Sequence, residues 1–272
     1  MFVALQEICA YRKQRIGMLS KNKLKYLRQL AQKKHRDAEG VFLAEGPKVV
    51  EDLLPHFDCR LLCATKAYLQ RMPSIKAGEL LEVTQRELEQ ASQLKTPREV
   101  LAVFGQPKPM SGTTLSDVAR KELVLMLDGV QDPGNVGTIV RIADWFGIEH
   151  VFCSEDTADV FAPKTVQATM GAVGRVKVTY GNLPEMLDAL PETIAIYGTF
   201  LDGENLYERP LSSNGVIVMG SEGQGISDAV SERVNRRLLI PNFPPDRPTG
   251  DSLNVAVATA VTCAEFRRRT SG

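Results

Sequence analysis

The chain has 272 residues, of which 43% are hydrophobic and 24% charged, and its formal net charge is zero. This length accommodates one large or two ordinary domains, and the composition is that of a globular protein. No apolar run approaches the ~18 residues of a membrane span, and basic residues follow the short N-terminal apolar stretch instead of preceding it. We therefore expect a cytoplasmic protein with neither a signal peptide nor a membrane partner.

The cysteines and histidines indicate no metal site. The five cysteines are scattered without a CxxC pair, and the three histidines are equally dispersed. Neither a zinc site nor a disulfide framework follows from such spacing. We expect buried or neutral thiols.

The first eighteen residues show no clear hydrophobic period, and Met18 would be an equally sensible start of the folded part. We expect residues 1–18 to form a disordered tail. From Lys21 to Arg36, apolar residues recur on one stripe, which predicts a single amphipathic helix with a basic polar side. Its lysines and arginines can pair with phosphates, although a merely solvated helix face is equally consistent with the charge.

Short apolar runs and helical segments then alternate, which predicts a small α/β domain over residues 19–104. Strands are expected at 41–44, 60–63, 80–84 and 100–104, and helices at 47–54, 66–71 and 85–91. Residues 105–114 are dense in Gly, Pro, Ser and Thr, so that we expect a linker over 105–121.

The remaining residues, 122–272, alternate in the same way, which predicts a mostly parallel sheet with helices on both faces. Strands are expected at 123–127, 150–153, 175–180, 194–199, 216–219 and 238–240. Helices are expected from about 137, at 163–171, 184–190 and 227–235, and from 252 to about 268.

The segment LVLMLDGVQDPGNVGTIVRIADWFG, residues 123–147, joins a buried strand to a polar loop and an apolar helix. Glycines let the loop approach a ligand, Asn135 offers both a donor and an acceptor, and Arg141 carries a planar cation that suits phosphate. The alternative is a tight turn with an Arg141–Asp144 ion pair on the helix surface. Because apolar residues crowd Arg141, we favour a functional role for it.

Two further polar segments follow. MGSEGQGIS, residues 219–227, joins a strand to a helix and matches neither a dinucleotide-binding loop nor a P-loop. Ile240-Pro241 precedes an irregular loop and the segment SLNVAVATA, in which Ser252 is a natural helix N-cap. Packing does not explain Asn254, which lies two residues into a helix rich in Val and Ala.

Together these motifs resemble the SpoU (TrmH-like) class of the SPOUT methyltransferases, which methylate ribose 2'-hydroxyls of RNA. The resemblance is carried by DGVQDPGNVGTIVRIADWFGI, MGSEGQGIS, the Ile-Pro pair and SLNVAVATA, with PK at 163–164 and MG at 170–171 as a secondary signature. SKNKLKYLRQL, FLAEG and LKTPREVLAVF are similar to the substrate-binding domain of the family. The chain departs from the pattern at Asn242, where methionine is usual, and in a longer loop over 241–252.

The resemblance implies S-adenosylmethionine as methyl donor, a deep C-terminal trefoil knot, and a homodimer formed through the C-terminal domain. It also implies that residues 19–104 form a ribosomal-protein-like α/β domain that binds the RNA substrate. The cofactor contacts that it implies are Thr199, Gly220, Ile240 and Leu253.

Methyl transfer to a 2'-hydroxyl requires that donor and acceptor be aligned and that a weakly acidic proton be removed. For this work the family motifs offer Asn135, Arg141, Glu222, Ser252 and Asn254. Arg141 is often regarded as the base, yet a guanidinium with a pKa above ~12 accepts a proton poorly. We favour Arg141 as a clamp for phosphate and developing alkoxide, with the proton leaving through Glu222 or water.

With an RNA substrate, the basic helix becomes an expected RNA-positioning surface. Its residues are Lys21, Lys23, Lys25, Arg28, Lys33 and Lys34. Ribosomal RNA is the expected substrate and transfer RNA the alternative, while a non-catalytic RNA-binding or assembly factor of the same fold is a second alternative. A nicotinamide-dependent enzyme is excluded because the GxGxxG loop and its acidic partner are absent.

Overall fold

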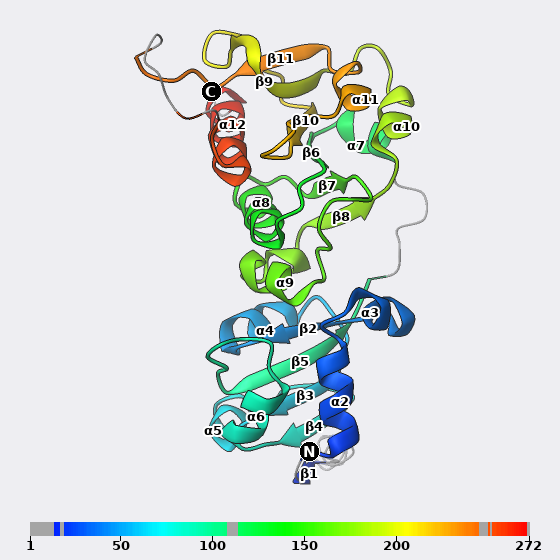
Figure 1. Ribbon diagram of the computed structural model, residues 1–272. Helices are drawn as coiled ribbons and strands as arrows, with labels where there is room; N and C mark the ends of the chain where they lie inside the picture. The colour runs from blue at the N-terminus through cyan, green and yellow to red at the C-terminus, as the bar shows by residue number, and fades with distance from the viewer. Residues whose placement is uncertain (1–13, 17–18, 108–113, 245–249, 251, 271–272) are drawn as a thin grey trace, which may run out of the picture. The chain divides into compact units, whose positions relative to one another are not determined.

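The computed structural model describes residues 14–16, 19–107, 114–244, 250 and 252–270. The chain divides into two compact units (Figure 1). Unit 1 comprises Met1–Lys108 and Phe161–Gly174, and unit 2 comprises Pro109–Val160 and Arg175–Gly272. Residues 161–174, which lie within the second predicted domain, group with unit 1.

Unit 1 contains a five-stranded mixed sheet in which β5 is antiparallel to both of its neighbours. In spatial order the strands are β1 (Gln14–Ile16), β4 (Glu79–Glu82), β3 (Cys59–Ala64), β5 (Val100–Gly105) and β2 (Val41–Glu45). The helices are α2 (Lys21–Gln29), α3 (Lys33–Glu39), α4 (Pro47–Leu53), α5 (Lys66–Arg71), α6 (Gln85–Ala91), α9 (Pro163–Thr169) and the 3-10 turn η1 (Ala172–Gly174). The strand β1 replaces part of the expected disordered tail, while Met18 lies outside the described residues.

The prediction of one helix over Lys21–Arg36 is wrong. Helix α2 ends at Gln29, and α3 begins at Lys33. Arg36 is buried, with 2% of its surface exposed, and its Nη1 donates to the carbonyls of Leu30 (2.8 Å) and Ala31 (2.9 Å). These carbonyls follow the end of α2 and would otherwise lack partners. Arg36 therefore stabilises the break instead of belonging to a basic outer face.

The segment Phe161–Gly174 belongs to unit 1 through close packing. The ring of Phe161 lies 4.8 Å from that of Phe42, a core residue of β2. At the end of α9, Gly171 has φ +92° and a Cβ there would lie 2.5 Å from the Cβ of Asp52. A side chain at Gly174 would lie 2.7 Å from the ring of His56. Small residues are thus required where this segment meets α4 and the turn after it.

Unit 2 contains a six-stranded sheet in which every neighbouring pair is parallel, as the strand and helix alternation predicts. In spatial order the strands are β11 (Arg236–Leu239), β9 (Ile196–Asn205), β10 (Gly215–Gly220), β6 (Leu123–Asp128), β7 (His150–Cys153) and β8 (Lys177–Tyr180). The helices are α7 (Leu115–Ala119), α8 (Pro133–Trp145), α10 (Leu183–Asp188), α11 (Asp228–Ser231) and α12 (Val255–Thr270). Helix α7 lies within the span expected to be linker.

Helices cover both faces of this sheet. Figure 1 shows α8 and α12 on one side and α7, α10 and α11 on the other. Because side chains alternate along a strand, Val124 and Met126 face the second group and pack with Leu115 and Leu187. Both faces of the central strands are therefore buried, which explains their continuous apolar runs.

The two helices that border the predicted site begin at residues other than those predicted. Helix α8 begins at Pro133, because the Oδ1 of Asp132 accepts the N–H of Asn135 at 2.9 Å. Helix α12 begins at Val255 and not at Ser252. Its cap is Asn254, whose Oδ1 accepts the N–H groups of residues 256 (3.1 Å) and 257 (3.3 Å).

None of the described helices combines the length and apolar character that a membrane crossing requires.

Candidate functional site

A cavity of about 480 Å³ opens beside the middle of β9, at the carboxyl ends of β10 and β11. Ligand sites of parallel sheets form at this edge, where loops from neighbouring strands meet. The walls are the end of β10 with its following loop, the turn after β11, β9 and the start of α12. The lining residues are Thr199, Phe200, Leu201, Met219, Gly220, Ser221, Glu222, Gly223, Gln224, Gly225, Ile226, Leu239, Ile240, Ser252, Leu253, Val255 and Ala258.

The loop after β10 folds back on itself beside this cavity. Ser221 and Gly225 exchange two backbone hydrogen bonds, at 3.0 and 2.9 Å, and Gly225 adopts φ +71°. A Cβ on Gly220 would lie 2.1 Å from the carbonyl carbon of Gly225. Gly220 is therefore a glycine because the loop backbone passes against it, and the loop presents backbone to the cavity.

Three predicted catalytic residues form a hydrogen-bonded chain. The Nδ2 of Asn254 donates to the Oδ1 of Asn135 at 3.1 Å, and the Nδ2 of Asn135 donates to the Oε1 of Glu222. The Oδ1 of Asn254 accepts the helix N–H groups described above, so its amide can only turn the Nδ2 toward Asn135. This fixes the direction of the whole chain and leaves Glu222 as the acceptor.

Two contacts of the residues at the end of β6 fix the loop that leads into α8, whose first turn carries Asn135. Asp128 is buried, and its Oδ2 accepts the N–H of Ser227 at 2.7 Å. Gly129, at φ +68°, donates its N–H to the Oγ of Ser154 at 2.9 Å. The loops that follow β6, β7 and β10 are thus bonded to one another, and nothing in the sequence indicates this contact of Asp128.

All four predicted cofactor contacts, Thr199, Gly220, Ile240 and Leu253, line the cavity, as does Ser252. Arg141 lies on the exposed side of α8 and is not among the lining residues. The Arg141–Asp144 ion pair does not form, because Asp144 accepts two hydrogen bonds from Arg175 at 2.8 and 2.9 Å. Among the described residues, Arg141 has no hydrogen bond or ion pair, so its guanidinium is open to a ligand.

The sequence gives no sign that Leu201 belongs to the cavity wall. It lies on β9, lines the cavity and has 76% of its surface exposed. Its neighbour Phe200 stacks under the guanidinium of Arg237, whose Cζ is 3.5 Å from the ring centre. Both residues look like ordinary members of a strand in the sequence, so neither role could be predicted from it.

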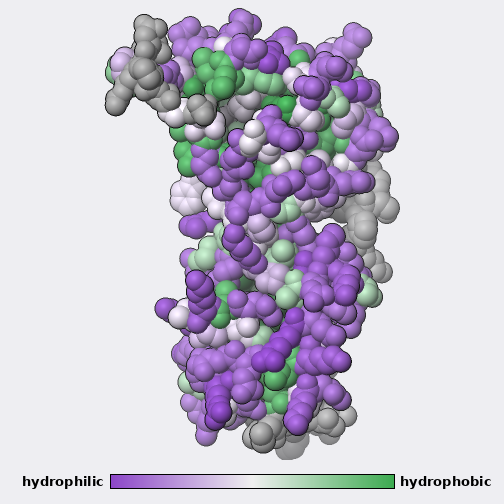
Figure 2. Space-filling view, in the orientation of Figure 1, coloured by the Kyte–Doolittle hydropathy of each residue, from purple (hydrophilic) through white to green (hydrophobic). Residues whose placement is uncertain are grey.

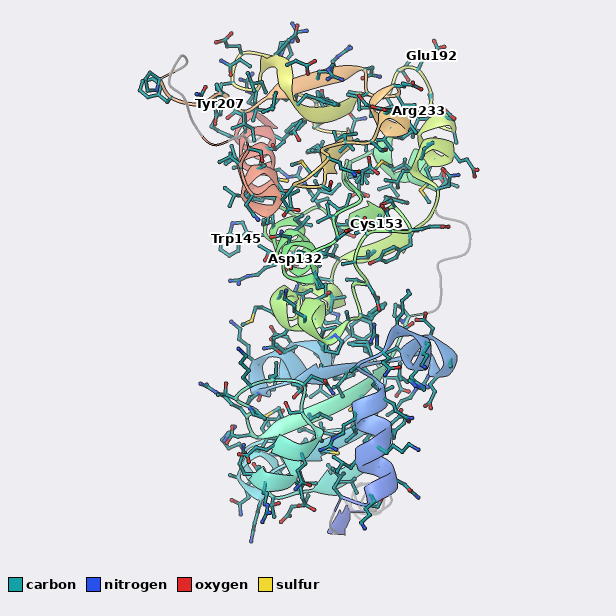
Figure 3. The ribbon with its side chains drawn as sticks, in the orientation of Figure 1. Asp132, Trp145, Cys153, Glu192, Tyr207 and Arg233 are labelled. Atoms are coloured by element: carbon teal, nitrogen blue, oxygen red, sulfur yellow. The ribbon has the colours of Figure 1, made fainter. Side chains whose placement is uncertain are left out.

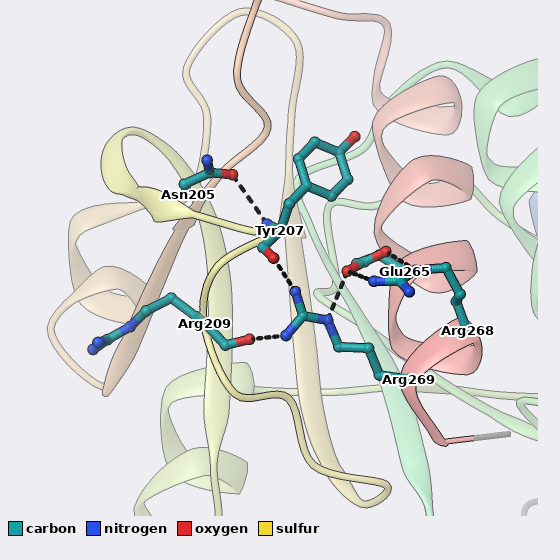
Figure 4. A network of polar contacts seen from close by, with 6 residues as sticks. All are labelled: Asn205, Tyr207, Arg209, Glu265, Arg268 and Arg269. Carbon is teal, nitrogen blue, oxygen red and sulfur yellow. Dashed lines mark hydrogen bonds and ion pairs between the residues drawn. The ribbon is translucent and has the colours of Figure 1, made fainter. Parts of the chain in front are cut away.

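The other end of α12 is held by a polar network (Figure 4). Glu265 accepts hydrogen bonds from Arg268 at 2.8 and 2.9 Å and from Arg269 at 2.6 Å. Arg269 also donates to the backbone carbonyls of Tyr207 and, at 2.7 Å, Arg209. These bonds, first those from Arg268, lower the pKa of Glu265 to about 2. The network joins α12 to the segment that follows β9.

Helices α8 and α12 pack side by side with their starts together, where Asn254 contacts Asn135, and their ends together, where Arg267 donates to the carbonyls of Phe146 and Gly147. Exposed apolar side chains lie at both ends of this pair. Trp145 is 84% exposed and projects away from the end of α8 (Figure 3), while Leu253 and Val257 near the start of α12 are each 50% exposed. Large apolar side chains left this exposed are candidates for contact with another chain.

Unit 1 carries the six predicted RNA-binding residues on two helices instead of one. Lys23 forms an ion pair with Glu79, and Lys33 lies 3.6 Å from Asp37. The Nε of Arg28 donates to the carbonyl of Gln90 at 2.7 Å. Lys21, Lys25 and Lys34 are exposed.

No cluster of His, Cys, Asp or Glu within the described ranges could hold a metal ion. Burial raises the pKa of the thiols of Cys59 and Cys63 to about 12, and it also raises that of Cys153. These cysteines are neutral core residues.

The chain is similar to known proteins over nearly its whole length. The 23S rRNA (guanosine(2553)-2'-O)-methyltransferase RlmP of Bacillus subtilis is 33% identical over 251 residues, which are 90% of this chain and 96% of that protein. A TrmH-family structure from Porphyromonas gingivalis is 44% identical, with a TM-score of 0.83 over 93% of this chain and 100% of that one. An AdoMet-bound rRNA methyltransferase from Sinorhizobium meliloti is 29% identical, with a TM-score of 0.79 over 94% and 98% of the two chains.

Models of two protein families match the chain in succession. The MRM3-like substrate binding domain matches residues 21–102. The model of the SpoU rRNA methylase family matches residues 122–264, which include the glycine loop, the cavity and the asparagine and glutamate chain. The chain therefore belongs to the SpoU rRNA methylase family.

Proposed function

We propose that this protein transfers a methyl group from S-adenosylmethionine to a ribose 2'-hydroxyl of ribosomal RNA. The observation that carries the proposal is the Asn254–Asn135–Glu222 chain beside the glycine-lined cavity. The rRNA methyltransferases of B. subtilis and S. meliloti, both similar over at least 90% of this chain, support ribosomal over transfer RNA.

The cavity fits the cofactor in size and in chemistry. Its volume of about 480 Å³ lies in the range of ~300–1,000 Å³ that small-molecule sites occupy. Leu201, Ile240 and Leu253 provide apolar walls, and the backbone of residues 220–225 provides hydrogen-bonding groups. The carboxylate of Glu222 suits a positively charged ligand. When bound, the cofactor supplies a methyl group on a positively charged sulfur.

The residues of the chain then act on the RNA. Asn254 and Asn135 hold Glu222 in place through amides whose orientation the cap of α12 determines. We infer that Glu222, directly or through water, receives the proton that leaves the 2'-hydroxyl. Arg141 binds the adjacent phosphate through its planar fork and stabilises negative charge on the attacking oxygen.

We further propose that two copies associate through α8 and α12, with exposed Trp145 at one end of this helix pair and Leu253 and Val257 at the other. Leu253 also lines the cavity, so such an interface adjoins the proposed site. The trefoil knot stays a prediction that family resemblance supports. A ribosomal RNA substrate favours the cytoplasm as the place of action.

The proposal is tested with purified protein, S-adenosylmethionine and unmodified 23S rRNA transcribed in vitro. Calorimetry is expected to show cofactor binding, and tritium from the labelled methyl group is expected in the RNA as an alkali-resistant 2'-O-methyl linkage. Cofactor binding by a Gly220→Ala variant should be at least tenfold weaker, because the new methyl group displaces the loop. If methyl groups were transferred to bulk transfer RNA and not to ribosomal RNA, transfer RNA would be the substrate instead. Absence of cofactor binding would favour a non-catalytic RNA-binding or assembly factor.

A further inference from the structure

The sheet of unit 1 gathers several loops at one edge. Strands β2, β3 and β4 run in the same direction, because β2 and β3 are both antiparallel to β5 and β3 is parallel to β4. Their carboxyl ends therefore share an edge, at which α4, α5 and α6 begin. Residues 92–99, between α6 and β5, return the chain to this same edge, which we call the carboxyl edge of unit 1.

Cations are exposed along this edge. They lie in the first turns of the three helices and in the loop, at Lys48, Lys66, Arg86, Lys95 and Arg98. None of these edge cations has a hydrogen bond or ion pair with the part of the chain that the structure describes. These cations come from separate stretches of sequence, so no run of charged residues indicates that they share a surface.

The neighbouring acids are mostly engaged within the unit. Glu45, 5% exposed, accepts hydrogen bonds from the Oγ of Ser92 and, at 2.9 Å, the N–H of Gln93. Glu87 forms a capping box at the start of α6 and accepts the N–H of Leu19 at 2.7 Å. Glu82, half-buried at the end of β4, is the remaining carboxylate of these strand ends. The cations thus face outward, while most of the neighbouring carboxylates form hydrogen bonds within the unit.

The loop over residues 92–99 is held in one conformation. Glu99 has φ 47°, which is uncommon for a residue with a side chain, and its carbonyl accepts the N–H of Thr65 at 2.8 Å. Its carboxylate accepts two hydrogen bonds from Arg71, each at 2.8 Å. The Nε2 of Gln85 donates to the carbonyl of Pro97 at 3.0 Å. A loop fixed at several points loses little conformational freedom when it binds a partner.

We infer that the carboxyl edge of unit 1, through Lys48, Lys66, Arg86, Lys95 and Arg98, is the main surface that binds the phosphate backbone of the RNA substrate. This inference rests on the proposed function and specifies its RNA contact. Unpaired cations carried on helix starts and a fixed loop suit phosphates, and the visible surface of unit 1 is mainly hydrophilic (Figure 2), which disfavours an apolar protein partner. On the basic face predicted from the sequence, by contrast, Lys23, Arg28 and Lys33 are engaged within the unit, which leaves Lys21, Lys25 and Lys34 exposed on two separate helices.

Two double charge reversals in the full chain test this. The edge variant is Lys95→Glu/Arg98→Glu, and the matched helix variant, with the same change in net charge, is Lys21→Glu/Lys25→Glu. Binding to unmodified B. subtilis 23S rRNA is measured by filter retention over a range of salt concentrations. The edge variant is expected to bind at least tenfold more weakly, and the slope of its log binding constant against log salt concentration is expected to be smaller by about 1.5–2. The helix variant is expected to show a smaller loss of affinity and a smaller change in slope.

Thermal unfolding verifies that each variant is folded, and calorimetry with S-adenosylmethionine verifies that the cofactor site of unit 2 is intact. The variant Lys95→Gln/Arg98→Gln repeats the test without added negative charge. Edge variants that bind within twofold of the unaltered protein, or no worse than the helix variant, overturn the inference while leaving the proposed function intact. Failure of the unaltered protein itself to bind rRNA would refute both.

Discussion

The substitution Asn254→Asp separates two roles that Asn254 combines. In the structure its Oδ1 caps α12, and its Nδ2 donates to Asn135. Aspartate retains the oxygen that caps the helix, and its negative charge suits a helix N-terminus. It cannot donate to Asn135, however. The amide of Asn135 is then expected to rotate, turning its Nδ2 toward position 254 and its oxygen toward Glu222.

The expected effects on stability and activity therefore diverge. The free energy of unfolding of Asn254→Asp should lie within about 0.5 kcal/mol of that of the unaltered protein. Asn254→Ala, which lacks the cap, should be less stable by ~0.5–2 kcal/mol. Rotation of Asn135 removes a hydrogen bond to the carboxylate of Glu222. Hydrogen bonds to charged groups contribute about 1.5–3 kcal/mol, so turnover of Asn254→Asp should fall roughly 10- to 150-fold.

Urea unfolding and initial rates of methyl transfer to unmodified 23S rRNA measure the two effects. Asn254→Ser, which keeps a neutral cap but cannot reach Asn135 in the same way, serves as the matched control for added charge. Full turnover of Asn254→Asp would show that the directed hydrogen-bond chain is unnecessary for catalysis. Destabilisation of Asn254→Asp as large as that of Asn254→Ala would refute the capping role.

Three further predictions concern unit 2. Arg141→Lys should lower turnover about 10- to 100-fold with unchanged cofactor affinity, because a lysine lacks the bidentate fork; initial rates equal to those of the unaltered protein would contradict this. Trp145→Glu should convert a dimer to a monomer in sedimentation velocity, and a dimeric variant would remove Trp145 from the interface. Since the pKa of Glu265 is lowered to about 2, its stabilisation is complete above its unfolded pKa of ~4.3 and is lost as the pH falls toward 2. Glu265→Gln should therefore be about 1–2 kcal/mol less stable at pH 7, after allowance for solvent around Arg268, and the difference should vanish near pH 2 in urea titrations.

The sequence predicts those elements whose signals are local. Helices α5 and α6 begin and end at the predicted residues, because threonine caps and apolar spacing lie within a few positions of one another. The break between α2 and α3 could not be predicted, since it depends on Arg36, six residues away from Leu30 and buried only by tertiary packing. A basic side chain in a basic run gives no sign that it is inside.

The same limit applies to the site. Glycine-rich motifs indicate which loops approach a ligand, and Thr199, Gly220, Ile240 and Leu253 do line one cavity. The sequence could not show that Asn254, and not Ser252, caps α12, because both residue types cap helices and only the backbone decides between them. The pairing of Asn254 with Asn135 spans 119 positions and emerges only when the sheet has formed.

The membership of Phe161–Gly174 in unit 1 affects how this protein can be divided. The chain passes between the units after residues 108, 160 and 174, so one cut in the connecting segment does not yield two self-contained modules. A fragment beginning at residue 122 would carry α9 without the ring of Phe42 and the side chain of Asp52 against which its segment packs. A fragment ending at 104 would expose Phe42 in turn. Exchange of substrate-binding domains between relatives would therefore have to transfer two separate stretches of sequence together.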